Sequence, residues 1–156
     1  MKTNFYTAFC SLALLSLLLV ARPAAADGLM MIRVQSAFPE AMASLQDAIN
    51  HQGYTISRVQ RVDVGLTKSG YKTAAYRVVF FGKPKEMAEL PVKYPDLTPY
   101  LPLKITIFAE RNESLLLTLD PMTLADFYPH KPGLRKYLER WKKDVRMIFD
   151  RMREGD

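Results

Sequence analysis

The sequence has a single cysteine, Cys10, and it lies in an apolar run at the N-terminus. If that run is removed, the remaining chain has no thiol. It can then form no disulfide, and both cysteine catalysis and thiolate metal binding are excluded. A hydrophobic core alone must stabilise the fold.

Histidine is nearly as scarce. His51 and His130 are far apart in the sequence, and neither has a carboxylate or a second histidine at ligand spacing. A metal site needs three or four converging ligands, so we predict none. The chain also lacks a Gly-x-Ser-x-Gly elbow, a His-Glu-x-x-His helix and a Gly-rich nucleotide loop. We therefore predict no cofactor.

Residues 1–26 have the layout of a secretory signal peptide. Lys2 supplies positive charge, the run Phe9–Val20 is almost wholly apolar, and Ala24–Ala26 offers the small residues that signal peptidase reads. The apolar run is shorter than the roughly 20 residues of a membrane span. We predict cleavage near Ala26 and export to a bacterial periplasm, with an uncleaved N-terminal anchor as the alternative.

The predicted mature chain, residues 27–156, is long enough for one domain that buries about two-thirds of its unfolded surface. Loss of Lys2 and Arg22 leaves 20 basic side chains against 16 acidic ones, a net charge of +4. This modest balance favours solubility or weak attraction to anionic surfaces. We expect no nucleic acid as a partner, because an exported protein rarely meets any.

Hydrophobic periodicity divides this domain into strands and two main helices. Alternation with a period of two, typical of strands, occurs in residues 29–36, 54–62, 76–81, 103–108 and 115–119. Met42, Leu45 and Ile49 recur at helical spacing between a predicted cap at Ser36 and a stop at Gly53. We expect a loop or one helical turn over 64–70.

The corner Phe80–Pro84 ends an apolar strand, because glycine permits unusual backbone angles and proline has no amide to donate. That strand is apolar on both faces near its end, so we expect it at the centre of the sheet. A short helix over Pro84–Leu90 should follow. Four further prolines forbid a long helix before Leu103: Pro91, Pro95, Pro99 and Pro102.

The closing segment, residues 132–154, carries the clearest helical stripe. Its apolar side chains step by four and three residues: Leu134, Leu138, Trp141, Val145, Ile148 and Met152. Its other faces are basic, with Glu139, Asp144, Asp150 and Glu154 interleaved, a mixture typical of a solvated face. Docking of this helix on anionic lipid is the alternative.

These elements predict an α+β domain: a curved, mainly antiparallel sheet of about five strands with two main helices on one face and a long C-terminal helix. Strands 103–108 and 115–119 should form a hairpin around the polar residues 110–114.

Residues 30–127 resemble the family called domain of unknown function 302. The resemblance rests on five pieces in order: His51–Tyr54, Arg61–Asp63, Phe81–Pro84, Tyr100–Ile105 and Asp120–Met122. Its motif positions here are Gly82, Pro84, Leu101 and Pro102. It implies a small β-α-β(4)-α-like sandwich, often paired into dimers, with no agreed activity. Lys83 stands where the family often has asparagine.

Two charged residues are candidate ligand contacts. Asp63 at a strand end is a candidate general base or ligand-binding group, or a turn residue that bonds local amides. Lys83 is a candidate for anion binding beside the proline-opened helix, or a solvated corner.

Tyr76, Tyr94 and Tyr100 are candidates to line a pocket between sheet and helices, together with Phe80, Phe108 and Trp141. A packed aromatic core without a cavity is the alternative.

The leading hypothesis is a non-catalytic exported module that binds a small apolar or amphipathic ligand, or a partner protein that includes a second copy of the chain. The rival is an enzyme that uses the strand-end carboxylates of Asp63, Glu110 and Asp120. A third reading is an accessory protein that contacts anionic membranes weakly through its basic C-terminal helix.

Overall fold

The computed structural model describes residues 28–155, so the predicted signal peptide and its cleavage site lie outside the described residues. Five strands form one antiparallel sheet in the order β1-β5-β4-β3-β2. Their bounds are Leu29–Val34 for β1, Thr55–Arg61 for β2, Tyr76–Gly82 for β3, Leu103–Glu110 for β4 and Glu113–Leu119 for β5.

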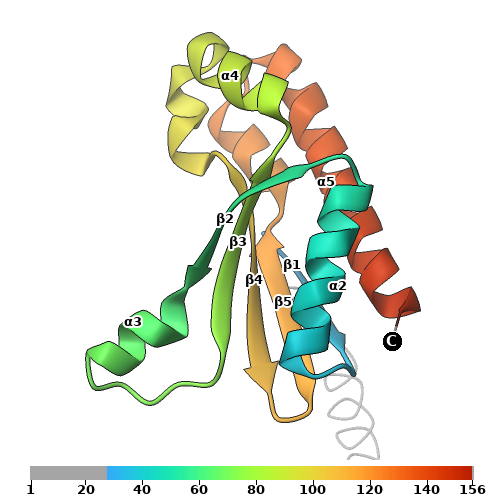
Figure 1. Ribbon diagram of the computed structural model, residues 1–156. Coiled ribbons are helices and arrows are strands. Elements are labelled where there is room, and N and C mark those ends of the chain that lie inside the picture. Colours follow the sequence, from blue (N-terminus) through green and yellow to red (C-terminus); the bar gives the residue numbers. More distant parts are fainter. Residues whose placement is uncertain (1–27, 156) are drawn as a thin grey trace, which may run out of the picture.

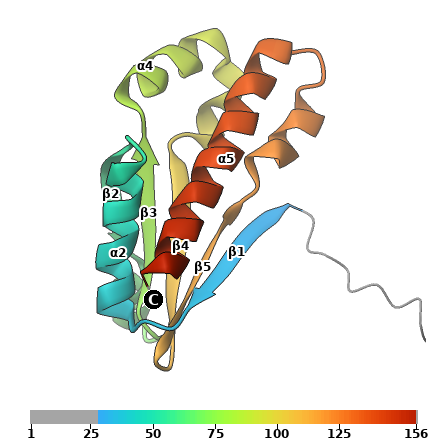
Figure 2. The same ribbon diagram turned by 90° about the vertical axis from the view of Figure 1, so that its right-hand side faces the viewer.

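Helices α2 (Phe38–His51) and α5 (Pro132–Glu154) pack against each other on one face of this sheet (Figures 1 and 2). At one end of the sheet lie α4 (Pro84–Lys93) and the 3-10 helices η2 (Pro95–Tyr100) and η3 (Pro121–Phe127), and α3 (Val62–Lys68) lies at the other end. The predicted α+β class, with two main helices on one face and a long C-terminal helix, is confirmed.

The core lies between the sheet and these two helices. Alternate residues of the strands point into it, including Ile105 and Ile107 of β4 and Leu116 of β5, and all three are fully buried. Every residue of the predicted stripe on α5 is buried as well. The sequence pattern predicted these buried positions correctly, because a two-residue period marks one face of a strand and a helical period marks one face of a helix.

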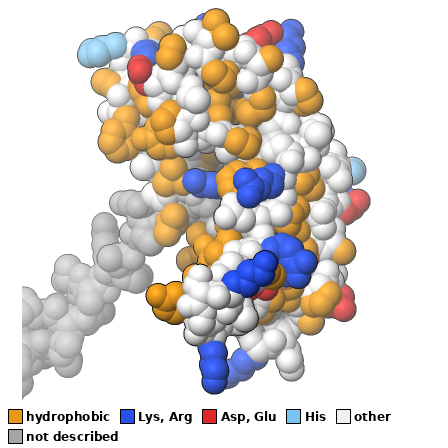
Figure 3. Space-filling view, turned by 60° about the vertical axis from the view of Figure 1, so that its left-hand side comes forward, with side chains coloured by type: hydrophobic (Ala, Val, Ile, Leu, Met, Phe, Trp, Pro, Cys, Tyr) orange, Lys and Arg blue, Asp and Glu red, His pale blue; other side chains and the backbone are white. Residues whose placement is uncertain are grey.

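The opposite face of the sheet is not covered by α2 or α5, and of the described helices α3 lies on this side, at one end of the sheet. Leu29 and Met31 of β1 are about half exposed there, at 48% and 51%. Figure 3 looks toward this side and shows apolar side chains interspersed with lysine and arginine. We call it the open face.

Several local predictions were wrong. Helix α3 begins at Val62, where we expected a strand to end, so of the two alternatives for residues 64–70 the helical one holds as far as Lys68 and the helix is longer than the single turn expected. Ser36 is not the cap of α2: Ala37 holds that position, and the Ser36 carbonyl accepts a hydrogen bond from Ser114 Oγ at 3.1 Å. Helix α4 continues past Pro91, since a proline in its last turn removes only one amide bond.

Strand β3 is internal, but β4 occupies the centre of the sheet. The β4–β5 hairpin lies between β3 and β1. This strand order depends on contacts between segments far apart in the sequence, and the composition of a single strand does not reveal it. Within residues 28–155, no helix is both long and apolar enough to cross a membrane.

Candidate functional site

The candidate site is a pocket at the end of the sheet where β4 and β5 part. Their pairing stops at Thr106 and Leu117. Beyond that point β5 stays paired with β1 as far as Leu119, and β4 stays paired with β3 as far as Leu103. The sheet therefore opens between its central strand β4 and the neighbouring strand β5.

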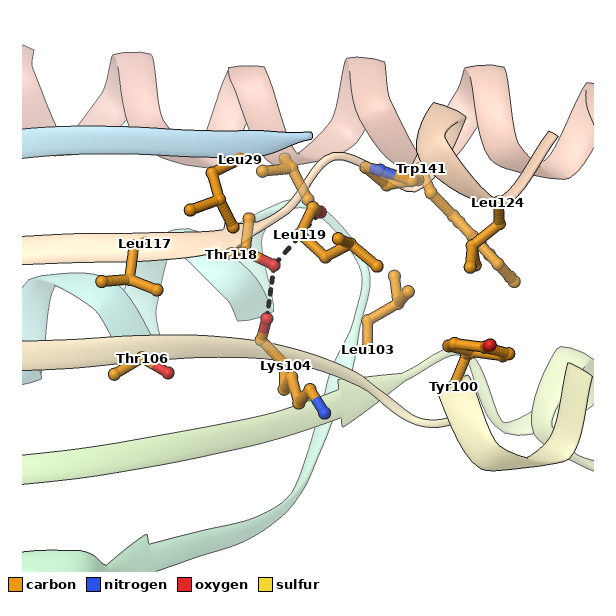
Figure 4. Close-up of a pocket in the computed structure, with 12 residues that line it drawn as sticks. Leu29, Tyr100, Leu103, Lys104, Thr106, Leu117, Thr118, Leu119, Leu124 and Trp141 are labelled. Carbon is orange, nitrogen blue, oxygen red and sulfur yellow. Dashed lines mark hydrogen bonds between the residues drawn. The ribbon is translucent and has the colours of Figure 1, made fainter. Parts of the chain in front are cut away.

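Where the backbone pairing of β4 and β5 ends, a side chain takes over as the hydrogen-bond partner of a backbone carbonyl. The hydroxyl of Thr118, which is nearly buried, donates a 2.6 Å hydrogen bond to the carbonyl oxygen of Lys104 across the gap (Figure 4). An unpaired buried carbonyl would cost free energy comparable to a lost hydrogen bond. The opening is thus a formed feature of the sheet.

The pocket in this gap has a volume of about 370 Å³, at the lower end of the range of roughly 300–1,000 Å³ that is usual for ligand sites. Side chains from β1, β4, β5, η2, η3 and α5 surround it (Figure 4). The lining is mainly apolar and consists of Leu29, Tyr100, Leu103, Lys104, Thr106, Leu117, Thr118, Leu119, Pro121, Leu124, Trp141 and Val145.

One wall of the pocket is fixed by Asp120. Its carboxylate accepts a 2.8 Å hydrogen bond from the Met122 amide and so caps η3, which begins at Pro121. The same carboxylate pairs with Lys142 of α5. This double attachment holds η3, and with it Leu124, against the long helix.

The predicted aromatic lining divides among three places. Tyr100 and Trp141 line the pocket, and Tyr94 is buried in the core. Tyr76 packs edge-to-face on Phe108 with 6.0 Å between ring centroids. Phe80 shares a cross-strand row with the exposed Lys104 on the open face.

Lys83 belongs to a buried polar cluster on the far side of Trp141. We call the set Tyr54, Lys83, Glu86, Arg140 and Asp144 the Asp144 cluster. Asp144, 6% exposed, accepts a 2.6 Å hydrogen bond from the Tyr54 hydroxyl, and Lys83 Nζ lies 3.7 Å from its carboxylate. Glu86 accepts a 2.6 Å bond from Arg140.

The Asp144 cluster contains two carboxylates and two cations, so its formal charges balance. Burial, reinforced by the hydrogen bond to Asp144, raises the pKa of the Tyr54 hydroxyl. The assignment of Asp144 to a solvated face of the closing helix was wrong. Besides Arg140 on the same helix, its partners include Tyr54 and Lys83 from distant parts of the sequence, and the pattern of the helix alone does not reveal those two.

The motif positions of the resemblance lie together around a second, shallower groove of about 460 Å³. Gly82, Pro84, Leu101 and Pro102 all line it. A β-carbon at Gly82 would lie 2.6 Å from Met87 Cγ, which explains the glycine by close approach of the helix that follows.

Asp63 is held by an ion pair. It lies in the first turn of α3, and its carboxylate accepts a hydrogen bond from the Arg77 guanidinium of β3. That bond holds the pKa of the Asp63 carboxyl below its ordinary value of 3.8. The contact fastens α3 to the sheet.

We expect Asp63→Asn to destabilise the protein near neutral pH by about 0.5–1 kcal/mol, and the difference from wild type to disappear between neutral and acidic pH, once the pH is below the folded-state pKa of Asp63. A carboxyl whose folded-state pKa is lowered stabilises the fold above its ordinary pKa. That contribution disappears as the pH falls through the folded-state value. Urea denaturation across this range measures it, and a difference that persists unchanged at the acid end would contradict the assignment.

The three strand-end carboxylates do not converge. Glu110 pairs with Arg33 at the tip of the β4–β5 hairpin, whereas Asp120 follows the other end of β5. That strand has seven residues, and about 3.3 Å per residue separates its ends by roughly 20 Å. Each of the three carboxylates is also committed to a cation.

Ion pairs neutralise much of the basic surface of α5. Five of its cations have carboxylate partners: Arg135, Arg140, Lys142, Arg151 and Arg153. Residues 28–155 contain no group of three or more histidine, cysteine or acidic side chains placed to hold a metal.

Comparison with known families and structures agrees with the fold. The family model described as "Domain of unknown function DUF302" matches residues 30–152. A crystal structure of an uncharacterized conserved DUF302 protein from Bacillus stearothermophilus superposes with a TM-score of 0.73 at 18% identity, covering 82% of this chain and 100% of the other. A search of functionally curated proteins found no match.

Proposed function

Since the chain belongs to the DUF302 family, which is described as a domain of unknown function, we propose a function from its own pocket. The protein is an exported, non-catalytic binding module. It holds a small apolar or amphipathic molecule in the pocket between β4 and β5.

The separation of β4 from β5 at this end of the sheet supports the proposal most directly. Continuous pairing of β4 with β5 would close this space, yet here the pairing stops at Thr106 and Leu117 and a side-chain hydrogen bond spans the gap. The pocket lining is mainly apolar, so a ligand gains free energy from apolar surface removed from water.

Trp141 makes the proposal directly testable. It is the only tryptophan in the sequence and it lines the pocket. Its fluorescence therefore reports occupancy, and titration with medium-chain alcohols and acids should change emission in a saturable way.

We expect Leu119→Phe to weaken such binding about tenfold, because the larger ring occupies the pocket. Leu119 is 37% exposed at the pocket, so the free energy of unfolding should change by no more than about 0.5 kcal/mol. Val92→Phe is the matched control, since Val92 is 82% exposed on α4 and outside the pocket. Equal affinity in both variants would overturn the proposal.

The open face favours a second candidate function, the binding of a partner protein that includes a second copy of the chain. Leu29, Met31 and Leu119 are exposed apolar residues at its β1–β5 edge. Native mass spectrometry decides between these functions. A clean dimer favours the open face, whereas a monomer with added mass favours the pocket.

A further inference from the structure

Three polar side chains at the pocket are hydrogen-bond donors without partners among the described residues. Lys104, Thr106 and Tyr100 follow one side of the gap in Figure 4. Within the described residues, the Lys104 amine and the two hydroxyl groups make neither an ion pair nor a hydrogen bond. An ammonium only donates, and hydroxyl groups can donate as well as accept.

Two carboxylates beside the pocket are already paired with cations. Asp120 is paired with Lys142 and Asp96 of η2 with Lys131, at 2.9 Å in the second pair. Asp126 of η3 is exposed and has no ion pair among the described residues, but no acidic side chain in the described structure pairs with the Lys104 amine. The pocket therefore presents an uncompensated positive charge beside its apolar lining.

A second cation lies on the same side of the sheet. Arg58 of β2 pairs with Phe80 of β3, and Phe80 pairs with Lys104 of β4, so the three share one cross-strand row. Two strand spacings place the two basic residues about 10 Å apart. Arg58 is exposed, and its guanidinium has no ion pair among the described residues.

The volume limits the size of the apolar part. A cavity of about 150 Å³ accommodates one benzene molecule. The 370 Å³ of this pocket therefore offers room for roughly a dozen carbon atoms. One medium-length chain fits this space better than the two chains of a membrane lipid.

From these observations we infer that the ligand is a single-chain amphipathic anion, with its acidic group at the Lys104 amine and its chain between β4 and β5. This inference rests on the proposed function and adds the chemical class. The Lys104 stem contributes apolar lining while its charged end stays in water.

The test compares decanoate, 1-decanol and decyltrimethylammonium, each below its micelle concentration, by Trp141 fluorescence and calorimetry. Lys104→Met should weaken decanoate binding about tenfold, the loss expected for one charge-assisted hydrogen bond at a solvated edge, and leave decanol binding unchanged. Lys104→Arg should retain decanoate binding. Lys136→Met is the control, since Lys136 is exposed on α5 and unpaired within the described residues.

The possible outcomes distinguish the inferred ligand class from the proposed binding function of the pocket. Selective loss of decanoate binding in Lys104→Met, with weakening by salt in the wild type, supports the inference. Equal loss of decanol binding, or a preference for the cationic ligand, overturns the inference and leaves the apolar pocket in place. If none of the three compounds binds, both the inference and the proposed function fail. Unchanged unfolding midpoints establish that the variants are folded.

Discussion

Asp144→Ala is expected to lower the free energy of unfolding by about 3–5 kcal/mol, the range for breaking a buried ion pair on one side. The loss leaves the Tyr54 hydroxyl buried without its 2.6 Å acceptor. It also removes the carboxylate that faces Lys83 and Arg140 at 3.7 Å and 3.3 Å. Urea denaturation followed by circular dichroism measures the effect.

Asp150→Ala is the matched control for this change. Asp150 lies on the same helix but is solvent-exposed, and its pair with Arg153 at 3.0 Å is a surface contact. Such a pair contributes about 0–1 kcal/mol. Similar losses in the two variants would mean that the Asp144 cluster contributes no more than a surface pair.

The elements with strong periodicity were predictable from the sequence. The closing helix runs from Pro132 to Glu154 as expected, and its apolar stripe is buried, because each of those positions reports the same face. The β4–β5 hairpin was also predicted, since the polar turn at residues 111 and 112 joins two alternating runs. Residues close together in the sequence determine both elements, so the sequence pattern is sufficient to predict them.

The pocket could not be predicted in the same way. Its opening depends on where the pairing of β4 with β5 stops, and register is a property of two strands together. In the sequence Thr118 is indistinguishable from any other strand residue. Only the structure shows that its hydroxyl donates a hydrogen bond to the Lys104 carbonyl. Lys83 likewise reads as a corner lysine until α5 brings Asp144 to it.

Trp141 connects the two regions that the sequence did not join. Its ring lines the pocket, while Nε1 donates a 3.1 Å hydrogen bond to Glu86 of the Asp144 cluster. This hydrogen bond to the cluster fixes the orientation of the indole ring. The cluster therefore acts on the pocket as a positioning element, through this side chain.

Trp141→Ala is expected to destabilise the protein by about 3–5 kcal/mol, because truncation of a buried tryptophan leaves a large cavity. Only 1% of the residue is exposed. Circular dichroism must follow unfolding, since the variant has no tryptophan. Tyr71→Ala, at an aromatic residue that is 64% exposed, should change stability by no more than about 0.5 kcal/mol.

Trp141→Phe separates the two roles of this residue. Phenylalanine keeps an aromatic wall but cannot donate to Glu86, which still accepts from Arg140. We expect a loss smaller than that of Trp141→Ala, together with weaker decanoate binding measured by calorimetry, because the ring is no longer held in place. If binding were unchanged while stability fell, the hydrogen bond to Glu86 would serve folding alone, and the pocket would be shaped without the cluster.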